Sequence, residues 1–284
     1  MSDTIFPPLP LAEWQETRDT IAGYAQLTGK IRRALTPHQK HWWHVSLRTA
    51  ATGLTTTPMP AGSKTLELLL DFTDHQLHIT TSHGERRQIP VHGQSAGAFK
   101  DETLAVLSEL GVEPQIDHSL FPDEGAAAYD RAAVARFWQA LSQVDTVFKT
   151  FRHGFRGESS PVQLWPHHFD LAVVWFSGRL VPDQDPADPE YADEQMNFGF
   201  VPGDGGIPEP YFYITAYPAT EGLTNTALPE GAYWQTEGWT GAVLPYRKLV
   251  GDPAPKERLL HFLQTVHKAG MTRMRDGSSG DVAA

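Results

Sequence analysis

The feature that most constrains the fold of this chain is an aromatic segment that occurs twice. PHQKHWWHVSL aligns without a gap on PVQLWPHHFDL, so that Pro37 matches Pro161 and His44 matches His168. The offset is 124 residues at both positions. Self-similarity at a fixed distance indicates a repeated structural unit. The alternative is a chance likeness between two aromatic strands.

The segments around this repeat follow the same order in both halves. Apolar residues at helical spacing open each half, over residues 11–35 and 137–151, and Asp130 precedes the second of these as its predicted N-cap. Strand-like segments follow, among them KTLELLLDF and HQLHITTS, which a TD turn joins into a predicted hairpin. A further helical pattern closes each half, with predicted ends at Gly111 and Gly270.

This order predicts an α+β fold with an internal duplication. Two helix–antiparallel sheet–helix units would be related by a pseudo-twofold axis, with a cavity near that axis. We expect a single compact domain over residues 1–276, made of similar halves at about residues 9–122 and 128–272. Residues 277–284 are expected to form a disordered tail, and the acidic, proline-rich residues 182–195 a long solvated loop.

Charge and composition exclude several classes of function. The formal net charge is −11, so we expect neither nucleic acid nor a membrane surface as a partner. The basic segment GKIRR is too short to bind a phosphate backbone. The chain contains no cysteine, which excludes disulfides, thiolate nucleophiles and cysteine-ligated metals. It shows neither a secretory signal nor an apolar run of about 20 residues, and a cytoplasmic location is expected.

Imidazole and carboxylate groups gather in the second copy of the repeat. If residues 161–177 form one extended segment, His168 and Asp170 point to one face and His167 to the other. Such a pair can bind a divalent metal, or supply a general base with its orienting carboxylate. His44 holds the equivalent position in the first copy and is the candidate third metal ligand. The alternative is a buried polar cluster that binds nothing.

Arg179 closes the apolar segment LAVVWFSGR. An unpaired guanidinium is costly to bury, so Arg179 requires a partner if it is enclosed. It is a candidate clamp for the carboxylate or phosphate of a substrate. The alternatives are an internal ion pair, with Asp170 or Glu158, or an exposed strand end.

Aromatic residues are concentrated in the strand-like segments, and most are expected to belong to the core. Some are candidates to line a ligand cavity, because pockets are mostly apolar with a few polar groups. We assign to ligand binding Trp165, His167 and His44 from the repeated segments, and Tyr211 and Tyr213 from one face of PYFYITAY. No nucleotide cofactor is expected, because GDGG lacks the strand-then-helix context of a dinucleotide loop.

The second half also carries the motif run SPV…FDLA…FSGR, followed by NFGFVPGD, PYFYITAYP and AVLPY. In these motifs the chain resembles a bacterial family catalogued only as a domain of unknown function. The resemblance implies membership but brings no activity, cofactor or catalytic residue with it. Family members read FWGSFDLA where this chain has LWPHHFDLA. The resemblance therefore implies that Asp170 and Arg179 belong to the shared motif, whereas His167 and His168 mark a subset.

Two classes of function fit these observations. The first is an enzyme acting on a small molecule, with His168 as base or metal ligand, Asp170 as its orienting residue or second ligand, and Arg179 as anion clamp. The second is a non-catalytic small-molecule-binding or structural protein, with its aromatic cavity or outer sheet face as working surface. A bound metal or a strongly shifted pKa at His168 would favour the enzyme. A packed segment around WPHHFDL with an internally paired Arg179 would favour the second class.

Overall fold

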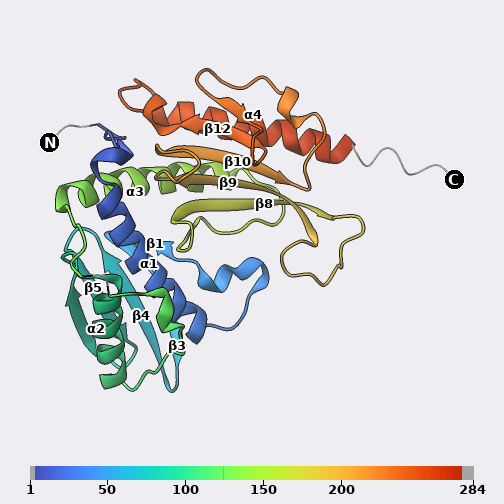
Figure 1. The fold of residues 1–284 in the computed structure, drawn as a ribbon. Coiled ribbons are helices and arrows are strands. Elements are labelled where there is room, and N and C mark those ends of the chain that lie inside the picture. The colour runs from blue at the N-terminus through green and yellow to red at the C-terminus, as the bar shows by residue number, and fades with distance from the viewer. Residues whose placement is uncertain (1–3, 124, 277–284) are drawn as a thin grey trace. The chain divides into compact units, whose positions relative to one another are not determined.

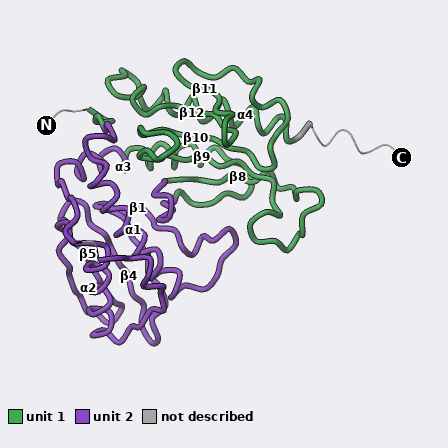
Figure 2. Tube along the Cα trace, in the orientation of Figure 1, with its two compact units in different colours: residues 1–8, 143–162, 171–284 green, residues 9–142, 163–170 purple. Residues whose placement is uncertain are grey.

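The computed structural model describes residues 4–123 and 125–276, and it contains two six-stranded antiparallel sheets with helices (Figure 1). The α+β class predicted from the sequence is confirmed. The chain divides into two compact units, which Figure 2 colours separately. Unit 1 comprises residues 1–8, 143–162 and 171–284, and unit 2 comprises residues 9–142 and 163–170. The tail predicted to be disordered lies outside the described residues.

Unit 2 holds the first sheet and the helices next to it in the sequence. Its helical elements are η1 (Leu11–Glu13), α1 (Gln15–Leu35), η2 (Lys40–Val45), α2 (Ala96–Glu109), η3 (His118–Leu120) and the start of α3 (Arg131–His153). Its strands are β1 (Arg48–Thr49), β2 (Gly53–Thr55), β3 (Met59–Ala61), β4 (Lys64–Asp71), β5 (Gln76–Thr81), β6 (Arg86–Pro90) and β7 (Gln163–Trp165). The first sheet has the order β1-β2-β4-β5-β6, and β3 also pairs with β4.

The core of unit 2 lies between this sheet and its helices. Helix α1 forms where the apolar period predicts it, because Ile21, Leu27 and Ile31 fall on one face and are fully buried. The ring of Tyr24 packs against Phe99 of α2, with centroids 4.2 Å apart. Strand β4 buries every second residue, namely Leu66, Leu68 and Leu70. This alternation fixes the register of the sheet.

The predicted hairpin is confirmed as β4 and β5, with Asp71 paired to Gln76. Its turn is closed by the Asp71 carboxylate, whose Oδ1 accepts hydrogen bonds from the backbone N–H groups of Thr73 and Asp74, each at 2.8 Å. This is an Asx-type turn, which explains how the short TD segment joins the two strands.

Unit 1 holds most of the second sheet. Its helical elements are the end of α3, η4 (Leu223–Asn225), η5 (Tyr246–Lys248) and α4 (Pro255–Asp276). The strands of the second half are β8 (Asp170–Leu180), β9 (Asp193–Val201), β10 (Tyr211–Tyr217), β11 (Tyr233–Gln235) and β12 (Gly241–Pro245). The second sheet has the order β11-β12-β10-β9-β8-β7.

Both long helices of the second half pack on the same face of this sheet within unit 1. Phe198 of β9 contacts Phe151 of α3, with ring centroids 4.8 Å apart, and His267 of α4, at 5.7 Å. The predicted cap of α3 is confirmed, because Asp130 Oδ1 accepts from the backbone of Ala132 at 2.8 Å. Helix α4 continues beyond its predicted end at Gly270. This glycine allows close packing instead, since an added Cβ would lie 2.5 Å from the sulfur of Met196.

The repeated aromatic segment is not a continuous strand in either copy, so that prediction was wrong. The first copy forms η2, in which His41 and Trp42 have φ of 52° and 58°. The second copy is interrupted after β7 by a turn over residues 166–169, and Phe169 in it has φ of 54°. Side chains in left-handed or turn backbone do not alternate between two faces, because alternation requires extended backbone.

Among the described residues, none of the helices combines the length and hydropathy that a membrane span requires.

Candidate functional site

Three segments of unit 2 meet at Gly29 of α1. A Cβ added to Gly29 would lie 2.6 Å from Cγ of Pro166 and 3.3 Å from the carbonyl oxygen of Val45. The turn 166–169 and the end of η2 therefore both press against α1 at this point. Leu47 and Leu164 exchange backbone hydrogen bonds of 2.8 and 2.9 Å, which join the segments that carry the two copies of the repeat.

Cationic and imidazole side chains surround this meeting point. We call this group the imidazole-rich face and define it as Lys30, Arg33, His38, His44, His167 and His168. The ring of His44 lies 4.8 Å from His38 and 5.5 Å from Trp42, measured between centroids. The guanidinium carbon of Arg33 lies 5.0 Å from the centre of the Trp42 ring. This distance is that of a cation–π contact. On the turn, the rings of His167 and His168 are 4.3 Å apart.

The charges of the face act on its imidazoles. Burial lowers the pKa of His44, and the positive charges of His38 and Arg33 lower this pKa further. His167 is exposed on its turn, yet the protein atoms around it lower its pKa to about 4, with smaller effects from His168 and Lys30. Both imidazoles are therefore held neutral at pH 7 by desolvation and by neighbouring positive charge.

A buried polar network lies next to the face in the same unit. Arg32 of α1 is 6% exposed, and its Nη1 donates to the backbone carbonyl of Ser46. Oε1 of Gln163, a residue that is 0% exposed, lies 2.8 Å from Ser46 Oγ and 2.7 Å from Nη1 of Arg48. Within the described residues, Nε of Arg32 and Nε2 of Gln163 are buried and have no hydrogen-bond acceptor.

The candidate catalytic residues His168 and Asp170 do not lie together on one face of an extended segment. His168 is exposed in the turn, whereas Asp170 is buried at the first position of β8. The ring contacts of His44 are with His38 and Trp42, and that of His168 is with His167. In residues 4–123 and 125–276, no group of three or more His, Asp or Glu side chains is placed to hold a metal ion. The assignment of His168, Asp170 and His44 to metal binding remains a prediction.

Arg179 forms an ion pair inside unit 1. Its Nε and Nη2 lie 3.2 and 3.1 Å from Oε2 of Glu194, and Nη2 also lies 3.3 Å from Oε1. The two side chains are 35% and 15% exposed. This partner on β9 was not anticipated, since the sequence suggested Asp170 or Glu158. A guanidinium engaged by a carboxylate in this way is not preset to receive a substrate anion.

The aromatic candidates lie in two different surroundings. Trp165 is half-buried at the end of β7, with its ring 5.9 Å from that of His167. In unit 1, the hydroxyl of Tyr211 donates to Asp204 at 2.6 Å. The ring of Tyr213 lies over the backbone of Gly199, where an added Cβ would be 2.2 Å from it. Tyr211 and Tyr213 thus belong to a small cluster on the sheet face opposite the helices.

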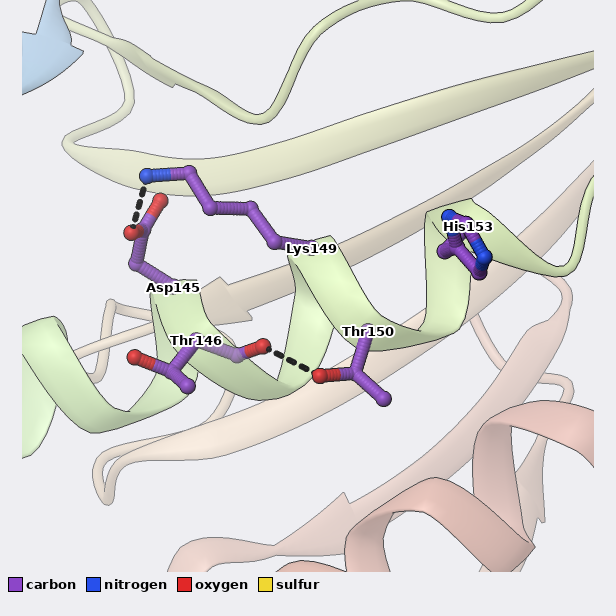
Figure 3. Close-up of a pocket in the computed structure, with 5 residues that line it drawn as sticks. All are labelled: Asp145, Thr146, Lys149, Thr150 and His153. Atoms are coloured by element: carbon purple, nitrogen blue, oxygen red, sulfur yellow. Dashed lines mark hydrogen bonds and ion pairs between the residues drawn. The ribbon is translucent and has the colours of Figure 1, made fainter.

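A shallow surface pocket lies along α3, lined by Asp145, Thr146, Lys149, Thr150 and His153 (Figure 3). All five side chains come from successive turns of one helix. Lys149 is held by Asp145 at 2.6 Å, and Thr150 donates to the backbone carbonyl of Thr146 at 2.9 Å. The side chains of Lys149 and Thr150 are thus engaged within the helix itself, and we do not assign a function to this pocket.

The sequence pointed to the histidines of the face but not to its arginines, its lysine or its glutamine. Lys30, Arg32 and Arg33 lie in GKIRR, which looked too short to bind a phosphate backbone, and a small anion requires fewer charges. Their spacing places Lys30 and Arg33 on one side of α1. No signal in the sequence marks Gln163, because its role depends on the contacts of β7.

The model of DUF5996, a family of unknown function, matches residues 6–276 of the chain. No curated protein and no solved structure matches it.

Proposed function

The chain belongs to DUF5996, a family of unknown function, and we propose that it is a non-catalytic protein that binds a small anionic molecule at the imidazole-rich face of unit 2. The observation that carries this proposal is the convergence of cationic and imidazole side chains in a chain of net charge −11. The permanent positive charges among them are those of Arg32 and Arg33, which lower the pKa of His44, and that of Lys30, which lowers the pKa of His167. Like charges held together raise the free energy of the unliganded protein, and a bound anion offsets this cost.

The positive charge of Lys30 also acts on the carboxylate of Asp117. Hydrogen bonds from Ser119 have the largest effect in lowering the pKa of Asp117, and Lys30 lowers it further. Asp117 is exposed in the loop that precedes η3, so its attraction for Lys30 is screened by solvent. Asp117 therefore offsets little of the charge of Lys30.

An enzyme acting on a small molecule is the second candidate function. The contacts of Arg179 in unit 1 argue against its role as the anion clamp of such an enzyme. Arg179 is bound by Glu194 through three contacts of 3.1 to 3.3 Å. His168 stands exposed in a turn, where a general base would require an orienting partner. Internal pairing of Arg179 is the outcome that favours a binding protein over an enzyme.

We also infer that the two halves arose by duplication. Each half contains a long helix, six strands and a closing helix in the same chain order. The common strand order supports this inference, since β1-β2-β4-β5-β6 corresponds position by position to β7-β8-β9-β10-β12. The additional strands, β3 and β11, occupy different places in the two sheets.

Anion binding can be tested by thermal unfolding. Sodium acetate, benzoate, sulfate and phosphate would be added at constant ionic strength, with sodium chloride as the balance. We expect at least one of them to raise the Tm in a saturable manner, because a ligand that binds only the folded state stabilises it. The double variant Lys30→Gln/Arg33→Gln should reduce that response at least fivefold in apparent affinity.

The control is Arg179→Gln, which removes one positive charge from unit 1, and it should leave the response unchanged. If no anion raises the Tm, or if the Lys30→Gln/Arg33→Gln protein responds like the wild type, the proposal is wrong. A loss of response in Arg179→Gln alone would instead support the enzyme class with Arg179 as its clamp.

A further inference from the structure

We propose that the ligand is an aromatic monocarboxylate and that its carboxylate group is bound by the buried side chains of Arg32 and Gln163. This inference rests on the proposed function, because it names the chemical class of the anion and the deepest part of its site. It extends the site from the imidazole-rich face into the polar network next to it.

The first argument is the buried charge of Arg32. Arg32 is 6% exposed, and burial lowers its pKa with no carboxylate among the causes. Its Nη1 donates to the carbonyl oxygen of Ser46, whereas its Nε has no acceptor among the described residues. Burying an arginine without a counter-charge is costly unless an anion completes its environment.

The second argument is the orientation of the Gln163 amide. Arg48 can only donate, and its Nη1 lies 2.7 Å from Oε1 of Gln163, so the oxygen of the amide must face Arg48. Ser46 Oγ approaches the same oxygen at 2.8 Å. The amide nitrogen is therefore fixed on the other side, where it is buried and has no acceptor. A buried donor without an acceptor destabilises the folded protein, and an acceptor on a ligand would remove this penalty.

Both Arg32 and Gln163 form hydrogen bonds with Ser46. Ser46 accepts from Arg32 through its carbonyl oxygen and contacts Gln163 through its hydroxyl. The guanidinium of Arg32 and the amide of Gln163 are therefore neighbours around Ser46. A carboxylate has two oxygens, and each can accept from one N–H donor.

The charge of the site favours a monoanion. The cations of the network are the buried Arg32 and the half-buried Arg48, and Arg48 already donates to Oε1 of Gln163, which leaves Arg32 to face the ligand. A dianion such as phosphate would bring a second negative charge into this desolvated place. The rings next to the network favour an aromatic remainder, because Trp42 stacks on His44 and also contacts His38. Binding pockets combine such apolar walls with a few polar groups.

Element η2 is where we expect the site to open. It carries Trp42 and Ser46 follows it directly, and both His41 and Trp42 hold left-handed backbone. Left-handed backbone is strained at residues other than glycine, so a change of the backbone at these two residues would relieve strain.

The test uses sodium benzoate as the probe and benzyl alcohol as its uncharged counterpart, with the full chain. Gln163→Glu is the informative variant. A glutamate keeps the acceptor for Ser46 and Arg48 and allows folding, but it places negative charge where the ligand carboxylate would lie. We expect benzoate to raise the Tm of the wild type and benzyl alcohol to leave it unchanged. In Gln163→Glu, the apparent Kd for benzoate should rise at least tenfold.

Gln264→Glu, which adds the same charge at an exposed position of α4, should bind benzoate like the wild type. Equal benzoate affinity in Gln163→Glu and the wild type would overturn this inference, as would a response to sulfate or phosphate without one to benzoate. In both cases the proposed function stands if Lys30→Gln/Arg33→Gln weakens anion binding. A wild type that responds to no anion would overturn the inference and the proposed function together.

Discussion

At the scale of single residues, His267 shows how burial sets the charge of an imidazole. The rings of Phe155 and Trp175 lie 5.0 and 4.8 Å from it, and those of Phe151 and Phe198 lie 5.7 Å from it. Within the described residues its Nε2 is buried without a hydrogen-bond partner. Burial lowers the pKa of His267 to about 4. An enclosure of apolar rings does this because it cannot solvate the charged form.

This residue makes protein stability depend on pH. The unfolded chain takes up a proton on His267 near pH 6.5, whereas the folded protein does so only near pH 4. The neutral, buried imidazole of His267 therefore makes its full contribution to the free energy of unfolding above pH 6.5. This contribution is lost as the pH falls from 6.5 to 4. In His267→Phe, the decrease in the free energy of unfolding between pH 7 and pH 4.5 should be smaller by about 2 kcal/mol. Urea unfolding at both pH values measures this difference.

The control is His261→Phe, at an exposed position of the same helix. It should retain the pH dependence of the wild type. The same decrease in His267→Phe as in the wild type would show that His267 is not the buried neutral group described above.

At the scale of elements, the contact between α1 and the turn 166–169 depends on the absence of a side chain at Gly29. Gly29→Ala would place a methyl group 2.6 Å from Cγ of Pro166. Alanine is the better helix former by about 1 kcal/mol, but the overlap should cost about 1 to 3 kcal/mol. We expect a net loss of stability and a weaker response to benzoate, measured by urea unfolding and by the shift in Tm.

Helix α1 provides its own control in Gly23. A methyl group there would meet only Cβ of Ala96, at an ordinary distance of 3.8 Å. Gly23→Ala should therefore stabilise the protein by about 0.5 to 1 kcal/mol and leave ligand binding unchanged. Two glycines of one helix would then respond in opposite directions. Equal effects would mean that helix propensity, and not the contact with Pro166, decides the outcome.

The elements also show what the sequence could predict. Periodic burial revealed α1 and the hairpin of β4 and β5, because local pattern and tertiary burial agree there. It failed in the repeated aromatic segment, where His41 and Trp42 adopt left-handed backbone that a pattern of apolar residues does not reveal. The histidines of the site could be selected from the sequence, because imidazole groups commonly bind metals or act as general bases. Gln163 could not be, because an amide becomes informative only when the orientation imposed by Arg48 is known.

At the scale of the whole molecule, the imidazole-rich face carries cationic side chains although the net charge of the chain is −11. The range of electrostatic forces decides which anions that face can attract. The Debye length is about 8 Å at 0.15 M salt and about 30 Å at 0.01 M. A small anion at the face experiences mainly its nearest charges. A long polyanion extends beyond the face and experiences the negative charge of the rest of the protein.

This difference predicts that nucleic acid does not bind, even when the salt concentration is lowered. A protein that binds DNA through its phosphates binds more tightly as salt is removed, because released counterions drive the association. Here, a fluorescein-labelled DNA duplex should show no binding by anisotropy at 0.15 M salt, and none should develop at 0.01 M, where the repulsion reaches further. Benzoate binding, measured on the same protein sample, confirms that the face is intact. Duplex binding that strengthens steeply as salt is removed would show that the face serves a polyanion, and that the local charges of α1 outweigh the net charge of the molecule.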